Sequence, residues 1–534
     1  MPDDELDSPV LIVGAGPVGL TTALALARLG IRSLILERRS GISPHPRARF
    51  INARSMEIFR RLGIETQIRA KAIPDGVASD VVWAPNLSAP EVRLVEIETL
   101  GPGSGEPYSP ASGVCTSQDV LDPILHDAVL SAGHTVIRFG ARLTDLEQDA
   151  EGVSATYLGA DGATAKLRAG FVVGADGPAS TVRERCGIGM LGPAALGQSV
   201  NIHFRADLTA ALRGRSVNMA MILNPAQPGL LLNIDGHKTW TAQAIVPAGV
   251  APDFDEERSR AVVRAQVGDP ELDVEILGIA PWTSAARVAE HLSSGRAFLV
   301  GDAAQEMPPA GGFGMNVGIQ EADNLVWKLA AVIQGWAGAG LLDTYEAERL
   351  PIARQVTQEA MLNLKSVGRV ESADGSPPQV KFGRPEFFHE RGLVFGATYT
   401  SAAVISDRTQ KPEVANEVSE YLPSATPGCR APHLWIEVDG KRTSTLDISH
   451  AGFVLLRAGA DSDAIVPPSG VPLRTVLSAD PALAEAYGLA DGGAVLIRPD
   501  GHVAWRAREV AEAEEIKRAL DSILDRAEVG VVTT

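Results

Sequence analysis

The sequence is poor in cysteine, and its few cysteines form no recognisable pattern. Cys115, Cys186 and Cys429 are isolated, with no C-x-x-C pair and no spacing typical of a metal site. We therefore expect no disulfide framework, no dithiol redox centre and no bound metal. Scattered single cysteines fit a reducing compartment, so we expect a cytoplasmic protein.

Positive charge and long apolar runs are also scarce. The chain has 48 Lys and Arg against 66 Asp and Glu, a formal net charge of −18. This balance argues against a nucleic-acid partner, which would require a basic surface. The acidic start, MPDDELD, lacks the positive charge of a signal peptide, and we expect neither a targeting segment nor a membrane span. A length of 534 residues predicts about two to four domains.

The stretch from Val10 to Arg39 predicts one complete βαβ unit with a nucleotide-binding turn. It contains an apolar strand, a G-x-G-x-x-G turn, a helix, a second strand and an acid at the end of that strand. In order these are Val10–Val13, then Gly14, Gly16 and Gly19, then Pro17–Leu29, Ser33–Leu36 and Glu37.

Each residue of this turn has a physical reason to be there. Gly14 permits the tight turn, Gly16 lets the backbone approach a pyrophosphate, and Gly19 lets helix and strand pack together. The phosphates would lie on unpaired N–H groups at the start of the helix. Glu37 would accept the ribose hydroxyls. From this unit alone the dinucleotide remains FAD, NAD or NADP.

Arginines are concentrated just after this unit, in the segment Pro44–Gly63. Arg47, Arg49 and Arg54 allow two interpretations, a solvated helix start or a clamp on the pyrophosphate. The second is attractive because the planar guanidinium binds oxygen atoms in pairs.

A second carboxylate-bearing turn occurs far downstream, in 296–329. An apolar strand, Ala297–Val300, ends at Gly301-Asp302, and a loop rich in Pro and Gly leads to a helix near Gly314. As at the N-terminus, this arrangement would place a carboxylate and free helix N–H groups beside a ligand. Between the two turns lie the strand FVVGAD, 171–176, followed by Gly177, and then alternating strands over about 199–286.

The order of these three motifs resembles the class A FAD-dependent aromatic monooxygenases, the family of para-hydroxybenzoate hydroxylase, phenol hydroxylase and the polyketide hydroxylases. The resemblance implies FAD as cofactor, with NADPH or NADH as a transient reductant, because no second Rossmann unit is present. It further implies that reduced flavin and O₂ form a C4a-hydroperoxide, which hydroxylates an electron-rich ring. The flavin then carries the chemistry, and no catalytic acid or base is named.

The same resemblance assigns the residues of the site. Those implied for the ADP half of FAD are Gly14, Gly16, Pro17, Gly19, Glu37 and Arg38. Those implied for the rest of the cofactor are Arg47 and Gln118 at the pyrophosphate and ribityl chain, Asp302 at the ribityl hydroxyls, Pro309, Gly314, Met315 and Asn316 beside the isoalloxazine ring, and Asp176 and Gly177 for FAD and nicotinamide. Candidates for the substrate pocket are Met221, Trp240, Pro308, Ala310 and Gly311.

Two positions depart from the family pattern. The family writes GDAAH and later I-x-D-A-x-N-L, whereas this chain has Gln305 and Glu321 at those places. Glutamine keeps hydrogen-bonding capacity but does not titrate near neutral pH, so it cannot serve as a histidine proton relay. Glutamate at 321 preserves the charge of the family aspartate.

Together these patterns predict an α/β protein in three parts. Residues 1–190 and 287–400, including the loops and strands of 70–115, would form a Rossmann-like FAD-binding domain, and 191–286 an inserted β-sheet domain for the substrate. The linker PGCRAPH, from Pro427, resembles the entry to the thioredoxin-like C-terminal domain of phenol and polyketide hydroxylases. We expect such a domain over 426–534, without C-x-x-C and hence without thiol redox chemistry.

The implied activity is hydroxylation of a phenolic or quinone-type polycyclic aromatic, with a polyketide of antibiotic biosynthesis as the favoured kind. A simple phenol as substrate and a Baeyer-Villiger oxygenase on the same scaffold remain alternatives, as does a non-catalytic flavoprotein that sequesters an aromatic drug. A halogenase is disfavoured because W-x-W-x-I-P is absent. We expect a small aromatic molecule as the partner, and a monomer or homodimer.

Overall fold

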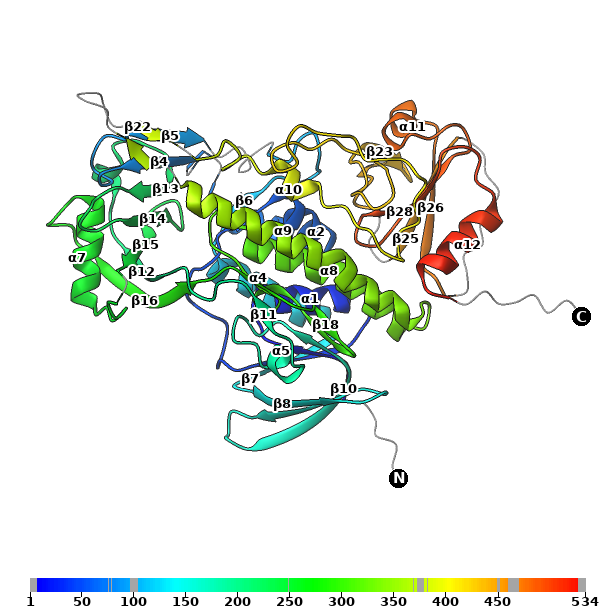
Figure 1. Ribbon diagram of the computed structural model, residues 1–534, viewed down its shortest axis with the longest axis horizontal. Coiled ribbons are helices and arrows are strands. Elements are labelled where there is room, and N and C mark those ends of the chain that lie inside the picture. The colour runs from blue at the N-terminus through cyan, green and yellow to red at the C-terminus, as the bar shows by residue number, and fades with distance from the viewer. Residues whose placement is uncertain are drawn as a thin grey trace, which may run out of the picture.

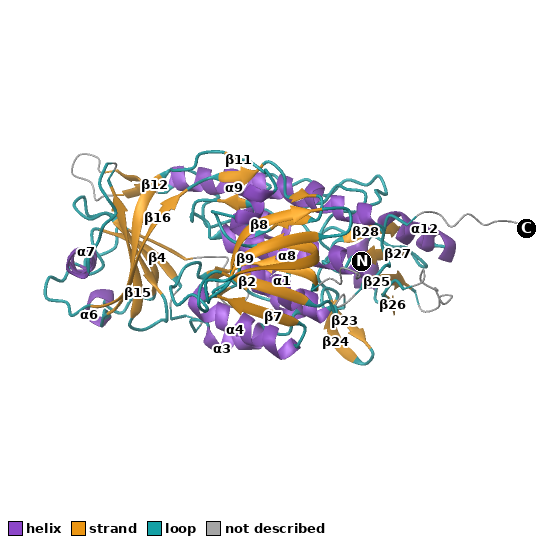
Figure 2. Cartoon of the chain, turned by 90° about the horizontal axis from the view of Figure 1, so that it is seen from below, coloured by secondary structure: helices purple, strands orange, loops and turns teal. Residues whose placement is uncertain are grey.

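The computed structural model describes residues 7–74, 76–77, 79–96, 104–247, 249–367, 369–371, 379–381, 383–448, 452–459 and 470–526. The chain forms an elongated molecule in which the inserted sheet and the C-terminal domain lie at opposite ends, with the dinucleotide-binding domain between them (Figure 1). The view from below shows the same order (Figure 2). None of the helices in these ranges is long and apolar enough to cross a membrane.

The central domain is built on a parallel sheet of Rossmann type. Its strand order is β18 (Ser293–Ser294), β19 (Ala297–Leu299), β10 (Thr164–Gly174), β1 (Ser8–Val13), β2 (Ser33–Glu37) and β7 (Thr135–Phe139), and β8 (Arg142–Gln148) with β9 (Val153–Leu158) extends β10. The inner strands β1 and β2 are buried almost throughout. Such continuous apolar strands are expected when helices cover both faces of a sheet.

Helices pack around this sheet and bring distant segments together. They are α1 (Pro17–Arg28), α2 (Ala53–Arg61), α3 (Glu65–Lys71), α4 (Gln118–Ala132), α5 (Thr181–Arg185), α8 (Phe313–Ile333) and α9 (Thr344–Ser366). Short strands complete the domain: β3 (Phe50–Ile51) with β6 (Val114–Cys115), and β11 (Met190–Leu191) with β17 (Arg287–Ala289) and β20 (Gln305–Glu306). Helix α1 packs against both α4 and α8. The two helices that follow the predicted turns, α1 and α8, are therefore neighbours.

The inserted domain is a sheet with helices on its far face. Its order is β16 (Glu275–Ser284), β12 (Gly197–Arg205), β15 (Thr239–Val246), β14 (Gly229–Asn233), β13 (Val217–Ile222), β4 (Asp80–Ala84) and β5 (Arg93–Glu96), with α6 (Thr209–Leu212) and α7 (Glu256–Val267). The assignment of all of 70–115 to the FAD-binding domain was therefore wrong. Strand β4 pairs in parallel with β13, and β5 pairs with β4 in antiparallel fashion. Pairing between such distant segments leaves no local sequence signal.

The C-terminal domain has a thioredoxin-like sheet. The order is β26 (Leu473–Ser478), β25 (Phe453–Ala458), β27 (Ala494–Ile497) and β28 (Val503–Ala507), in which β26 and β25 are parallel and the others antiparallel. Helices α11 (Pro481–Tyr487) and α12 (Ala513–Ile523) pack on it, and the hairpin of β23 (Trp435–Val438) and β24 (Lys441–Ser444) precedes it. The hairpin of β21 (Arg369–Glu371) and β22 (Gln379–Lys381) and helix α10 (Arg391–Phe395) lie between α9 and this domain in the chain.

Candidate functional site

The three glycines of the first turn serve different purposes. A Cβ atom at Gly14 would overlap the Ala175 carbonyl oxygen, and one at Gly19 would overlap the carbonyl oxygen of Gly14. Gly14 also has φ +106°, a conformation that residues with a side chain rarely adopt. No heavy atom lies within 4 Å of a Cβ built at Gly16. Close packing therefore requires Gly14 and Gly19, whereas Gly16 leaves room for a ligand.

The start of α1 is suited to an anion. Gly16 caps the helix without any side-chain hydrogen bond, and Pro17 occupies its first turn. The N–H groups of this turn are left for a phosphate, which the helix dipole also favours. The buried Glu37 carboxylate lies beside the turn, where it accepts N–H bonds from Ala15 at 2.7 Å and Arg39 at 2.8 Å. This geometry fits the adenosine half of a dinucleotide.

Arg47 interacts electrostatically with both Asp302 and Asp122. Partial shielding from water raises the pKa of Asp302 to about 6, and nearby Glu306 raises it further, whereas Arg47 opposes the shift. The same shielding lowers the pKa of Arg47, and nearby Arg39 lowers it further, while Asp302 and Asp122 oppose the shift. An exposed arginine opposite a carboxylate provides one group for a pyrophosphate and one for ribityl hydroxyls.

Gln118 lies at the first position of α4, facing the same group of charges. Its side-chain amide donates to Asp122 at 3.0 Å. Burial raises the pKa of Asp122 to about 7, while Gln118 and the arginines Arg39 and Arg47 lower it. Sequence reasoning missed Asp122, although it stands one helical turn after Gln118 on the same face.

The loop before α8 forms a second helix start without a side-chain cap. Gly312 caps α8 at φ +66°, so the first N–H groups of this helix are also left for a ligand. The Asn316 side chain is fully used within the protein. Its amide donates to the carbonyls of Phe50 at 2.9 Å and Gly312 at 2.8 Å, and its oxygen accepts from the Asn52 N–H at 3.0 Å. The Asn316 side chain is therefore already bonded within the protein, and contact of this residue with a flavin stays a prediction.

The remaining predicted loop residues differ in exposure. Pro309 is exposed, Ala310, Gly311 and Gly314 are partly exposed, and Pro308 and Met315 are buried. Asp176 caps α5 by accepting the Ser180 hydroxyl at 2.5 Å and the Thr181 N–H at 2.7 Å, and burial raises its pKa. Gly177 takes φ +83° with open space around its Cβ position. Asp176 therefore has a structural task, and its contact with a cofactor stays a prediction, as does that of Arg38, which is exposed beside Glu37.

Gln305 and Glu321, which depart from the family pattern, contact each other in the interior. Glu321 Oε2 accepts the Gly301 N–H at 2.8 Å and the Gln305 amide at 3.0 Å. Burial raises the pKa of Glu321 to about 7, although Arg349 lowers it. Glu321 thus fixes the backbone at Gly301, directly before Asp302.

The inserted sheet presents one face to the dinucleotide-binding domain and packs its other face under α7. Trp240 belongs to the core on the α7 side, together with Val262 and Val263. Its assignment to the pocket wall was wrong, because alternation along β15 turns it away from the cofactor. Met221 lies on the opposite, inner face with Trp83. It remains a candidate for the pocket.

Two of the three arginines that the sequence left open have structural partners. Buried Arg49 donates to the carbonyls of Asn233 at 2.6 Å and Asn218 at 3.0 Å, which joins the central domain to the inner side of the sheet. Arg54 donates to Glu57 at 2.8 Å and to the Asp500 carbonyl at 2.7 Å. Neither the solvated nor the clamp interpretation holds for this pair, and Arg47 alone of the three is exposed.

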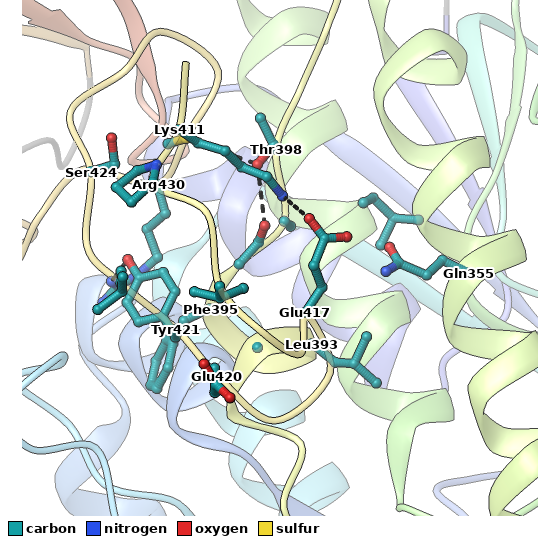
Figure 3. A pocket seen from close by; sticks show the side chains of 18 of the residues that line it. Gln355, Leu393, Phe395, Thr398, Lys411, Glu417, Glu420, Tyr421, Ser424 and Arg430 are labelled. Carbon is teal, nitrogen blue, oxygen red and sulfur yellow. Dashed lines mark hydrogen bonds and ion pairs between the residues drawn. The ribbon is translucent and has the colours of Figure 1, made fainter. Parts of the chain in front are cut away.

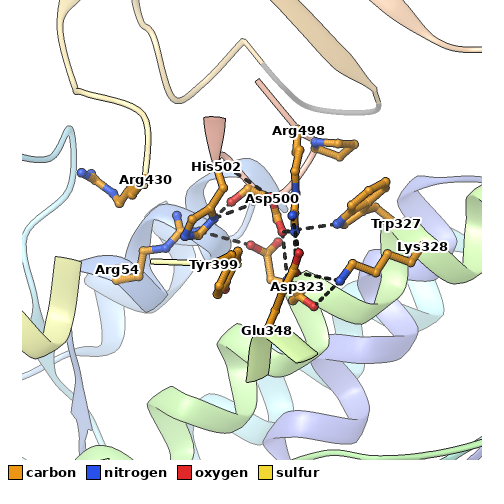
Figure 4. A network of polar contacts seen from close by, with 12 residues as sticks. Arg54, Asp323, Trp327, Lys328, Glu348, Tyr399, Arg430, Arg498, Asp500 and His502 are labelled. Carbon is orange, nitrogen blue, oxygen red and sulfur yellow. Dashed lines mark hydrogen bonds and ion pairs between the residues drawn. The ribbon is translucent and has the colours of Figure 1, made fainter. Parts of the chain in front are cut away.

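Two further features had no sequence signal. A cavity of about 240 Å³ lies between α9, α10 and the segment 411–430, where Lys411 and Glu417 form an ion pair at 2.7 Å (Figure 3). No residue predicted to hold FAD lines it. The second feature is a buried polar network that joins the C-terminal domain to α8 and α9 (Figure 4). Its members include Asn324, Trp327, Lys328, Glu348, Arg498 and Asp500.

Comparison with known proteins agrees with this geometry. The model of the FAD binding domain matches residues 7–360, and that of the aromatic-ring hydroxylase C-terminal domain matches 424–527. Aklavinone 12-hydroxylase of Streptomyces purpurascens is 37% identical over 98% of this chain and 100% of its own. A ternary complex of aklavinone-11 hydroxylase with FAD and aklavinone has a TM-score of 0.85 at 35% identity, covering 98% of this chain and 100% of the other. The flavin-dependent monooxygenase PieE, in complex with FAD and substrate, has a TM-score of 0.88 at 31% identity with the same coverage.

The Rossmann turn, the second helix start and the inserted sheet define a dinucleotide-binding oxidoreductase with an inserted sheet domain. With these matches, the chain belongs to the class A FAD-dependent aromatic monooxygenases, in the branch that carries the aromatic-ring hydroxylase C-terminal domain. FAD is its cofactor.

Proposed function

We propose that this enzyme hydroxylates a polycyclic phenol or quinone-type aromatic of the polyketide kind. The inner face of the inserted sheet carries this proposal, because it combines polar side chains on two strands with apolar ones on their neighbours. Residues that alternate with the α7-side core place Asn201, His203, Thr241 and Gln243 on β12 and β15, and Met219, Met221, Leu230, Leu232 and Trp83 on β13, β14 and β4. A flat ring system with oxygen substituents along one edge matches such a surface.

The chain's own residues would position the reactants and exclude water. Bound FAD supplies the reduction of O₂ and the transfer of one oxygen atom. Met219 and Met221, which pack on buried Trp83, would cover the substrate rings, and the amides of Asn201 and Gln243 would bind its oxygen atoms. Arg49 holds the sheet against the central domain through Asn218 and Asn233, which fixes the distance between the substrate surface and the cofactor.

For the reductant, we propose NADH or NADPH bound transiently beside the flavin. The described strands contain one Rossmann sheet, and its first turn is the FAD site. Exposed Arg38 and Arg47 offer positive charge to a second dinucleotide as well as to FAD.

The cysteines bear on the cellular setting of the enzyme. Cys115, Cys186 and Cys429 are all free thiols, which supports a cytoplasmic enzyme. We propose a monomer or homodimer that acts on a small aromatic molecule. Sedimentation of the purified protein measures the oligomeric state directly.

The decisive experiment is oxidation of NADH and of NADPH by the purified yellow protein in air. Phenols, hydroxyanthraquinones and tetracyclic polyketide aromatics are added one at a time, and products are weighed by mass spectrometry. We expect acceleration by a polycyclic compound and a product one oxygen atom heavier. Its connectivity, measured by NMR, separates ring hydroxylation from Baeyer-Villiger insertion. Flavin-bound protein that no aromatic accelerates would instead indicate a sequestering role.

A further inference from the structure

A chain of polar contacts leads from the loop before α8 towards the inner face of the inserted sheet. The Asn363 side-chain amide, near the end of α9, lies 3.5 Å from the Ala310 carbonyl oxygen and donates to Glu390 Oε1 at 3.0 Å. Asn363 and Glu390 are both buried, with exposed fractions of 1% and 4%. Asn363 therefore links the loop before α8 to Glu390.

Phe388 occupies an unusual backbone conformation within this segment. Its φ is +72°, in the left-handed region that a bulky residue seldom adopts. The Phe388 N–H donates to the same Glu390 oxygen at 3.3 Å. A strained residue persists only where its surroundings hold it, and such residues are common at ligand sites. Glu390 thus contributes to holding Phe388, together with the rings of Phe387 and Trp83 that pack on it.

The Phe388 ring forms an aromatic wall with Trp83 at the inner face of the sheet. The two ring centroids are 6.3 Å apart at an interplanar angle of 78°, an edge-to-face contact. Met219, Met221 and Val380 pack in the same cluster. Trp83 is fully buried, whereas Phe388 is half-buried, so part of its ring is available to a ligand.

The raised pKa of the Glu390 carboxyl is consistent with its position behind the apolar side chains of the aromatic wall. Burial raises its pKa to about 7, although the Phe388 N–H and the Asn363 amide oppose this. The carboxyl is therefore largely neutral in mildly acidic solution, and its oxygen accepts the Phe388 N–H whether the group is protonated or ionised.

We propose that Phe388 is a specificity-determining residue, whose ring bounds one end of the inner face on which the substrate would lie, and that Glu390 is the positioning residue for this ring. The inference rests on the proposed function, since it deepens the description of the same surface. The Phe388 side chain would limit how many fused rings of a substrate fit over the inner face of the sheet. Removing it deprives a small ligand of a contact and opens space that a larger ligand fills.

Ligand binding to the FAD-loaded enzyme tests this without turnover. Dissociation constants are measured from the perturbation of the visible flavin spectrum by 2,4-dichlorophenol with one ring, alizarin with three and aklavinone with four. For Phe388→Ala we expect the ratio of the affinity for aklavinone to that for 2,4-dichlorophenol to rise by about tenfold. Glu390→Leu should move it in the same direction, whereas Glu390→Gln, which keeps an acceptor, should retain the wild-type ratio.

Two controls separate this effect from general loosening. Phe254 is also half-buried, but its ring lies on the α7 side under Arg258, so Phe254→Ala should leave the ratio unchanged. Phe388→Gly should melt at a higher temperature than Phe388→Ala, because glycine accepts φ +72° without strain.

The outcomes distinguish this inference from the proposed function. Equal ratios in wild type and Phe388→Ala overturn the inference, as does the absence of any spectral change with all three probes in both proteins. A wild-type enzyme that binds the probes but yields no oxygenated product overturns the proposed function, while the affinity ratio still decides the role of Phe388.

Discussion

Arg498 and Glu348 form a two-pronged ion pair in the interior, although 150 residues separate them in the chain. Arg498 Nη1 lies 2.6 Å from Glu348 Oε1, Nη2 lies 2.8 Å from Oε2, and both side chains are completely buried. The pair joins the C-terminal domain to α9. Lys328 of α8 donates to the same carboxylate at 2.8 Å, so the second half of this helix is fixed against α9 and the C-terminal domain.

Replacing Arg498 by methionine should therefore destabilise the whole protein. Glu348 and Asp500 would lose their shared partner in an environment without water. The expected cost is about 3 to 5 kcal/mol of unfolding free energy, measured by urea denaturation. Arg205→Met is the matched control, because Arg205 pairs with Glu275 at 2.7 Å with both side chains more than half exposed, and its loss should cost under about 1 kcal/mol. Equal losses would contradict the role of burial.

Glu57 should make the protein sensitive to acid. Burial alone would raise its pKa, but Arg430 and Arg54 lower it from 4.5 to about 2. A lowered pKa stabilises the fold above pH 4.5, and this contribution is lost as pH falls towards 2. It amounts to about 3 kcal/mol. The unfolding free energy of Glu57→Gln should fall less steeply than that of wild type between these pH values, and parallel curves would refute the assignment.

Glu321 should produce the opposite pH dependence. Burial raises its pKa from 4.5 to about 7, although Arg349 lowers it, so the folded state binds the proton more tightly than the unfolded chain. Its contribution to stability is present below pH 4.5 and is lost as pH rises through 7. Between pH 5 and pH 8 wild type should lose about 1 to 3 kcal/mol relative to Glu321→Gln. The exposed Glu275→Gln serves as the control and should follow wild type.

Gly16 should be required for FAD and not for folding. Open space surrounds its Cβ position and its φ is −81°, so alanine fits the protein but blocks the approach of a pyrophosphate. Gly16→Ala should melt near the wild-type apoprotein and bind FAD at least about tenfold more weakly, as measured by fluorescence titration. Gly197→Ala, at another glycine with open space around its Cβ position, should bind FAD normally. Normal affinity in Gly16→Ala would exclude its contact with the cofactor.

Parts of the molecule whose contacts are local in sequence could be predicted without a structure. The turn at Gly14, the helix behind it and Glu37 lie within one βαβ unit, so their spacing in the chain fixes their spacing in space. The uncapped start of α8 likewise follows from the glycines before it. These segments determined the nucleotide fold and the family.

Features that depend on pairing between distant strands needed the tertiary structure. Alternation predicts that a strand has two faces, but strand partners decide which face meets the core. Met221 and Trp240 both lie in apolar strands, and only the sheet register places Trp240 under α7. Pairing with the distant strand β13 likewise places β4 in the inserted sheet, which its own sequence does not reveal.

The sequence by itself determined the first βαβ unit, its glycine turn and the family, because this unit is made of short-range backbone geometry. Only the tertiary structure decided the partners of its charged interior residues. Nothing in the local sequence marks Arg49, Arg54 and Arg498 as buried, yet each is buried against groups far along the chain. A buried charge is tolerated only beside a partner that pairs or hydrogen-bonds with it. Because that partner can lie anywhere along the chain, no local sequence pattern predicts it.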